Sequence, residues 1–175
     1  IGDRIALMKD GEIIQIGTGE EILTNPANDY VRTFLEDVDR SKVLTVENAM
    51  IRPISINIDV DGPKVALQRM REEEVSVVLA VNKLREFKGY ITADDALEAS
   101  KRGEGSLVNY LRTDMPTVQK DMYIQDVLSI ISDSKTPLAV VQDEKLVGVL
   151  IRGVVIEALS SSDENEGVKE NVPAT

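Results

Sequence analysis

Thr92 and Asp95 are the polar side chains whose types and spacing are best suited to chemistry in this sequence. They lie in the stretch GYITADDAL, residues 89–97, where a glycine and an apolar triplet precede a helix-like run. The pattern predicts Thr92 at the end of a strand and Asp95 in the first turn of the next helix. Free backbone N–H groups there favour an anion, and a carboxylate can accept hydrogen bonds from two ribose hydroxyls. The alternative is that the pair only caps the helix, since this spacing is a variant of the capping box.

A second stretch, GVLIRGVVIEAL at residues 148–159, has the same layout but is apolar at the equivalent positions. Ile151 and Val154 replace the threonine and the aspartate. Arg152 lies between them and could meet a phosphate; its alternative role is a solvated cation near a helix start. The two stretches therefore predict one site with ribose chemistry and a second that is either structural or binds a phosphate-rich ligand.

The elements that position these residues repeat along the chain, about 60 residues apart. The first unit contains RPISINID, a helix near residues 63–73, VSVVLAV, GYIT and a helix from Ala93. The second contains MPTVQKD, a helix near residues 124–132, TPLAVVQ, KLVGVLI and a helix from Arg152. Each unit reads as strand, helix, strand, strand, helix, with a polar, glycine-rich joint, KRGEGS, between them. One unit of this size is marginal alone, so we expect the two to pack together.

Composition excludes several kinds of chemistry. The 175 residues include no cysteine and no histidine, so thiolate chemistry and the commonest zinc ligand and general base are absent, and we expect no metal site. The net charge of −11 argues against nucleic-acid binding, because a basic surplus is needed to displace counterions. No apolar run approaches the ~20 residues needed to cross a bilayer, so we expect no direct membrane insertion.

The first forty residues predict a hairpin and two helices. Asp10-Gly11 between apolar runs indicates a tight turn. Thr18 and Glu21 form a capping box, and Asn25 followed by Pro26 indicates the cap of a second helix.

The repeats resemble CBS domains, on the Gly-x-x-Thr-x-x-Asp ending at Gly89, Thr92 and Asp95, the element order and the stretch TPLAVVQDEKLVGVL. The resemblance implies an α/β (α+β) fold in which two CBS domains form a Bateman module. It also implies two crossed clefts, each built from both repeats, which bind an adenine nucleotide or cyclic di-AMP. One cleft would use Thr92, Asp95, Thr117 and Leu138, the last within the strand at residues 137–139. The alternative site, for a cyclic dinucleotide, would use Ser55, Val77, Ile151 and Arg152. Thr117 has a structural role as its alternative.

The stretch IGDRIALMKDGEIIQIGTGEEILTNPANDYVRTFL resembles the end of an ABC transporter ATPase domain. Followed by a CBS pair, it is similar to the ATP-binding subunits of glycine betaine/proline importers. The chain does not begin with Met, and the phosphate-binding Gly-x-x-x-x-Gly-Lys-Ser/Thr loop is missing. We therefore expect an excised part that cannot hydrolyse ATP, whereas its parent would. The resemblance implies a homodimer, a permease partner contacted through the ATPase domain, and a place at the inner face of the plasma membrane.

These interpretations divide the chain into an ATPase remnant (1–42), two CBS domains (45–103 and 107–160) and a disordered acidic tail (161–175). The tail carries four acidic residues and one lysine, and it is either a contributor to ionic-strength sensing or a solubilising end. The helix faces expected to meet in a dimer carry Ala96, Leu97, Val155, Ile156 and Leu159. Three alternatives stay open: a nucleotide-sensing regulator of another protein, a purely structural dimerisation module, and an enzyme using the carboxylates of REEE (72–74) or EDVD (36–39).

Overall fold

The computed structural model describes residues 4–160. Its N-terminal part is a hairpin followed by two short helices. Strands β1 (Ile5–Lys9) and β2 (Glu12–Gly17) pair antiparallel. Their turn uses Asp10 and Gly11, both with positive φ, as the Asp-Gly dipeptide predicts. Helix α1 (Gly19–Thr24) begins at the predicted capping box, with Thr18 and Glu21 bonded reciprocally.

The cap predicted for the second helix is wrong. Helix α2 (Asp29–Glu36) is capped by Asn28, whose side chain accepts from the N–H of Val31. Asn25 instead ends α1, and the side chain of Gln15 on the hairpin bonds the Asn25 carbonyl. Gln15, ten residues upstream, thus binds the backbone of Asn25, while Asn28 caps the helix.

The two predicted units are present, each with a three-stranded sheet and two helices. The first contains β3 (Ser55–Asn57), α4 (Pro63–Glu72), β4 (Val77–Val81), β5 (Phe87–Thr92) and α5 (Ala93–Lys101). The second contains β6 (Thr117–Gln119), α6 (Ile124–Asp133), β7 (Leu138–Gln142), β8 (Lys145–Leu150) and α7 (Arg152–Ser160). In each sheet the first two strands are parallel and the last two antiparallel, and the register shifts at equivalent positions, Ala80/Val81 and Val140/Val141.

The segments that lead into the two units are exchanged between them. Short helix α3 (Val46–Ala49) precedes the first sheet, yet Val46 and Ala49 are buried in the core of the second repeat. Conversely the 3₁₀ turn η2 (Val108–Tyr110) precedes the second sheet, yet Leu107 is buried in the core of the first. Isolated bridges pin both crossings, Ile51 to Val149 and Tyr90 to Arg112.

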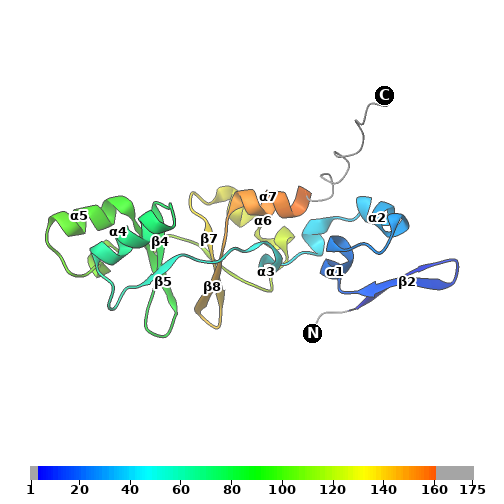
Figure 1. Ribbon diagram of the computed structural model, residues 1–175, viewed down its shortest axis with the longest axis horizontal. Helices are drawn as coiled ribbons and strands as arrows, with labels where there is room; N and C mark the ends of the chain where they lie inside the picture. Colours follow the sequence, from blue (N-terminus) through cyan, green and yellow to red (C-terminus); the bar gives the residue numbers. More distant parts are fainter. Residues whose placement is uncertain (1–3, 161–175) are drawn as a thin grey trace, which may run out of the picture.

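Three apolar clusters stabilise this arrangement, because each removes aliphatic surface from water. Two are the repeat cores, and the third joins the repeats through Leu79, Tyr90, Met115, Ala139 and Leu146. Figure 1 shows an elongated molecule in which the second repeat lies between the N-terminal part and the first repeat. Leu23 of α1 belongs to the core of the second repeat. The 3₁₀ turn η1 (Arg40–Lys42) joins that N-terminal part to α3 and packs against α6.

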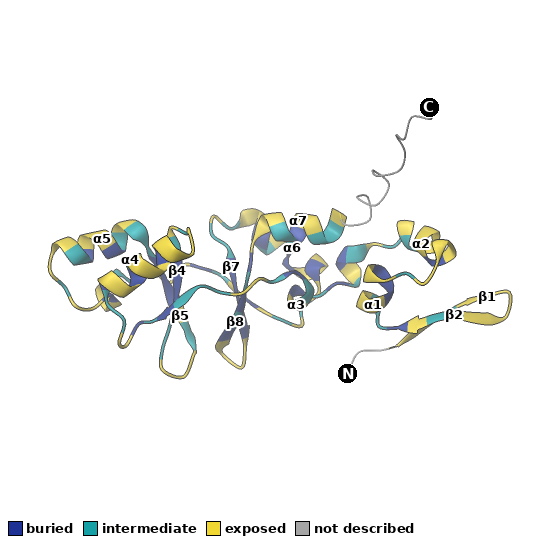
Figure 2. Cartoon of the chain, viewed as in Figure 1, coloured by how far each residue is buried: buried dark blue, intermediate teal, exposed yellow. Residues whose placement is uncertain are grey.

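The hairpin β1–β2 projects from the end of the molecule and is largely exposed (Figure 2). Of the expected dimer-facing residues, Ala96 and Val155 are buried inside their own repeats, so these two expectations are wrong. Leu97 and Ile156 are exposed on α5 and α7. Within residues 4–160, no helix combines the length and the apolar character that a membrane span requires. The acidic tail lies outside the described residues.

Candidate nucleotide site

Thr92 and Asp95 lie together where β5 passes into α5, as the sequence predicts. The Thr92 side chain accepts from the Asp95 N–H at 3.2 Å and donates to Asp95 Oδ2 at 2.6 Å. The Thr92 N–H donates to the same carboxylate oxygen at 3.1 Å. The pair therefore forms a complete capping box, which is the alternative that the sequence left open.

The Asp95 carboxylate also binds a cation that sequence reasoning missed. Arg112 donates from Nε to Oδ2 at 2.8 Å and from Nη2 to Oδ1 at 2.9 Å. Such a bidentate pair is stronger than a single neutral hydrogen bond. These hydrogen bonds from Arg112, reinforced by those from Thr92, lower the pKa of Asp95 to about 2. The carboxylate is therefore ionised throughout the physiological pH range.

Arg112 reaches this carboxylate because its backbone is bound to β5. The N–H of Tyr90 donates to the Arg112 carbonyl at 2.9 Å, and the N–H of Arg112 donates back at 3.0 Å. Gly89 permits the approach: it has φ +144°, and a Cβ built there would lie 2.1 Å from the Arg112 carbonyl oxygen. The Tyr90 hydroxyl donates to Asp114 at 2.9 Å, and burial followed by this contact raises the pKa of the phenol.

The other two residues predicted for this cleft come from the second repeat. Thr117 is exposed at the start of β6, and its register partner is Ala139 of β7. Leu138 is fully buried in the core of the second repeat, so only its backbone is available to a ligand. Among the described residues no hydrogen bond joins Thr92 or Asp95 to Thr117 or Leu138. The two halves approach each other through Tyr90 and Met115 in the cluster between the repeats.

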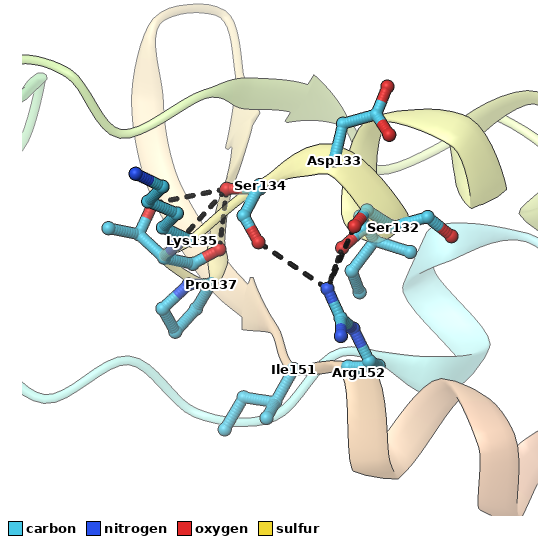
Figure 3. Close-up of a pocket in the computed structure, with 9 residues that line it drawn as sticks. Ser132, Asp133, Ser134, Lys135, Pro137, Ile151 and Arg152 are labelled. Atoms are coloured by element: carbon cyan, nitrogen blue, oxygen red, sulfur yellow. Dashed lines mark hydrogen bonds between the residues drawn. The ribbon is translucent and has the colours of Figure 1, made fainter.

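Arg152, of the alternative site, caps another helix. Its Nη2 donates to the carbonyls of Ile131 at 2.9 Å and Ser132 at 3.0 Å, and more weakly to that of Ser134 at 3.4 Å (Figure 3). These carbonyls lie at the C-terminal end of α6, where a cation is favourable. The guanidinium is therefore neither free in solvent nor without partners.

Arg152 and Ile151 line a surface hollow of about 620 Å³. Its other lining residues are Ile131, Ser132, Asp133, Ser134, Lys135, Thr136 and Pro137, all from the second repeat. Ser55 and Val77, the remaining residues of the alternative site, lie on β3 and β4 of the first repeat and do not line this hollow. The polar loop at residues 132–136 was missed because it carries no motif.

The chain is similar to known transporter subunits and CBS proteins. A CBS domain family model matches residues 107–161. The glycine betaine/carnitine transport ATP-binding protein GbuA of Listeria monocytogenes is 46% identical over 165 residues, which is 94% of this chain and 42% of that protein. The glycine betaine transport ATP-binding protein OpuAA of Bacillus subtilis is 45% identical over 94% of this chain and 39% of its own length. The chain thus spans less than half the length of these relatives.

Solved structures agree with the fold. Staphylococcus aureus OpuCA is 26% identical with a TM-score of 0.57, over 63% of this chain and 94% of that one. CbpB in complex with c-di-AMP has a TM-score of 0.60 at 14% identity, over 82% and 94% of the two chains. CBSX2 in complex with AMP has a TM-score of 0.55 at 20% identity, over 65% and 94%. The last two show the fold alone. The expected fold class and resemblance are confirmed: the chain has the fold of a tandem CBS module, and over 94% of its length it is similar to glycine betaine transport ATP-binding proteins.

Proposed function

We propose that this chain is the regulatory module of the ATP-binding subunit of an osmoprotectant importer. It binds an adenine nucleotide or cyclic di-AMP, or senses ionic strength, and passes the result to the ATPase of the parent. The observation that carries the proposal is the match to GbuA, which extends over 94% of the chain and so includes the N-terminal part as well as both repeats. The module itself performs no catalysis in this proposal; its parent uses ATP and contacts the permease at the inner face of the plasma membrane.

The packing supports communication between the repeats and the N-terminal part. Leu23 and Leu44 are buried in the core of the second repeat, together with α3. The bridge between Thr45 and Tyr123 fixes the connecting segment to the same repeat. A ligand that shifts the second repeat would therefore move the segment that resembles the end of an ATPase domain.

The two ligand classes have separate candidate sites. A mononucleotide would bind at Thr92, Asp95, Thr117 and the backbone of Leu138, whereas cyclic di-AMP would bind near Ser55, Val77, Ile151 and Arg152. Solved CBS proteins of the same fold are complexes with AMP and with c-di-AMP, respectively. The domain boundaries 1–42, 45–103 and 107–160 and a homodimer through the exposed Leu97 and Ile156 belong to the same proposal.

Calorimetric titration of the chain with AMP, ATP and cyclic di-AMP tests the proposal. Asp95→Ala should weaken mononucleotide binding and spare cyclic di-AMP, and Arg152→Ala should do the reverse. Losing a hydrogen bond to a charged group costs roughly 1.5–3 kcal/mol. Uptake of glycine betaine by the intact transporter in vesicles, measured with and without the ligand that binds, then tests gating. If no nucleotide binds and neither nucleotide nor internal salt changes uptake, the module is a structural dimerisation unit.

A further inference from the structure

Both oxygens of the Asp95 carboxylate already accept hydrogen bonds from side chains or backbone of this structure. Oδ2 accepts from the Thr92 N–H, the Thr92 hydroxyl and Arg112 Nε, and Oδ1 accepts from Arg112 Nη2. The Asp95 side chain is only 14% exposed, so it has little room to accept further donors from a new direction. A ribose diol needs at least one of these oxygens as its acceptor. The four donor groups of Thr92 and Arg112 are therefore competitors of a sugar for this carboxylate.

Of these competitors, only the Arg112 side chain can leave without unfolding the local structure. The Thr92 contacts are part of the cap of α5. The Arg112 backbone is held by two hydrogen bonds to Tyr90. Its side chain, however, is 50% exposed, so the guanidinium can rotate into solvent while the backbone stays in place.

The second repeat has the same crossing without the ion pair. There the bridge joins Ile51 to Val149, so Ile51 occupies the place that Arg112 has in the first. Val154 is the sequence equivalent of the aspartate. The cation and the carboxylate thus occur together in one repeat and are replaced together by apolar residues in the other.

We propose that Arg112 is an intramolecular competitor for the Asp95 carboxylate, so that a ribose-containing ligand enters this cleft only when the Arg112–Asp95 ion pair opens. This inference rests on the proposed nucleotide-binding function and names a residue that regulates it. AMP and cyclic di-AMP both contain ribose. The ion pair would lower the affinity of either ligand at the cleft that contains Asp95, and it would not affect binding near Arg152. The unliganded module is therefore held in a closed state by its own side chain.

Calorimetry with adenosine tests the competition, because adenosine carries the ribose and no phosphate charge. Arg112→Gln should bind adenosine about tenfold more tightly than the native chain, the factor that corresponds to an opening cost of about 1.4 kcal/mol. Arg112→Lys, which keeps the charge but loses bidentate geometry, should give an intermediate gain. Arg102→Gln is the matched control, since Arg102, at the C-terminal cap of α5, pairs with Glu98 of that helix and its loss should leave the affinity unchanged. The double variant Asp95→Asn/Arg112→Gln should lose the gain.

Salt provides a readout that does not depend on how well a variant folds. Between 0.1 and 1 M NaCl the Debye length falls from about 10 Å to about 3 Å, which weakens a half-exposed ion pair. The affinity of the native chain for adenosine should therefore rise with salt, and that of Arg112→Gln should stay flat by comparison.

The outcomes separate this inference from the function on which it rests. If the native chain and Arg112→Gln bind adenosine equally and respond equally to salt, the competition is refuted, while binding of any nucleotide leaves the proposed function standing. If neither protein binds adenosine, AMP or cyclic di-AMP, the competition is refuted, and the proposed function then depends on whether internal salt changes uptake by the intact transporter.

Discussion

Replacing Gly89 with alanine should destabilise the protein more than any other glycine-to-alanine change in the repeats. The new Cβ would lie 2.1 Å from the Arg112 carbonyl oxygen and 3.1 Å from the Arg112 carbonyl carbon. These are backbone atoms, so the crossing segment itself must move. The φ of +144° is also unfavourable for alanine.

The magnitude follows from the contacts that are lost. A non-glycine residue in such a backbone region costs about 1–3 kcal/mol. Displacing the segment breaks the two hydrogen bonds between Tyr90 and Arg112, each worth about 0.5–1.5 kcal/mol. The free energy of unfolding should therefore fall by about 3–4 kcal/mol.

Two other glycines provide matched controls for Gly89→Ala. Gly103 also has a positive φ, +73°, but a Cβ there meets nothing within 4 Å, so Gly103→Ala should cost only about 1 kcal/mol. The Cβ of Gly148→Ala would meet the Met50 side chain, whose Sδ can rotate away whereas its Cβ, at 3.0 Å, has to shift by a few tenths of an ångström, so its cost should lie between the other two at about 1–2 kcal/mol. Urea unfolding followed by circular dichroism measures all three. If Gly89→Ala costs no more than Gly103→Ala, the crossing segment does not hold Arg112 against β5 as described.

Four further changes test other parts of the structure. The pKa of Asp95 is lowered from 3.8 to about 2, so the ionised carboxylate stabilises the fold above pH 3.8, and this stabilisation is lost as the pH falls through about 2. Asp95→Asn should therefore lower the free energy of unfolding by about 1–2 kcal/mol at pH 6, a figure that allows for the exposure of Arg112. In the same urea assay near pH 2 it should cost almost nothing. Arg152→Ala should lower the unfolding free energy by about 1–2 kcal/mol because three carbonyls lose their donor, and an unchanged urea midpoint would contradict the capping role. Leu23→Ala should cost about 2–3 kcal/mol, since Leu23 is buried in the second repeat, and a loss below 0.5 kcal/mol would show that α1 is not docked there. Ile156→Glu should convert a dimer into a monomer in sedimentation experiments, whereas Leu84→Glu, at a similarly exposed position in the loop between β4 and β5, should not.

The local features of the fold were predictable because their causes are local. The hairpin follows from Asp10-Gly11, and the capping box from Thr18 and Glu21, within four residues of each other. The repeat was readable from the order of apolar runs. Asn25 was misassigned because its role is fixed by Gln15 on another element, and no local pattern contains that contact.

The candidate site was only half predictable for the same reason. Thr92 and Asp95 were found from their spacing, but Arg112 lies 17 residues further on, in a segment with no motif. Arg152 was noticed, yet its carbonyl partners are about 20 residues away in sequence. The nearest clue to Arg112 was the repeat itself: once the opening segments are known to cross, the segment before β6 must lie beside β5.

The crossing also accounts for the difference between the two repeats at the positions equivalent to Asp95 and Arg112, which are polar in the first repeat and apolar in the second. Gly89 and Gly148 stand at equivalent positions, and each leaves room for the segment that opens the other repeat. In one case the segment brings a cation to a carboxylate, and in the other it brings Ile51 to an apolar strand. The second repeat, which is apolar at these positions, is also the one whose core includes Leu23, so the N-terminal part packs against it.

A physically continuous route then joins the ion pair to the N-terminal part. The segment that carries Arg112 continues through Met115, which is buried between the repeats, into β6 of the second repeat. Val118 of β6 lies in the same core as Leu23. Packing alone does not transmit a change unless some element along it has two arrangements. In the competition proposed above, the half-exposed Arg112 side chain, bound to Asp95 or released into solvent, is that element, and a ribose at Asp95 would decide between its two positions.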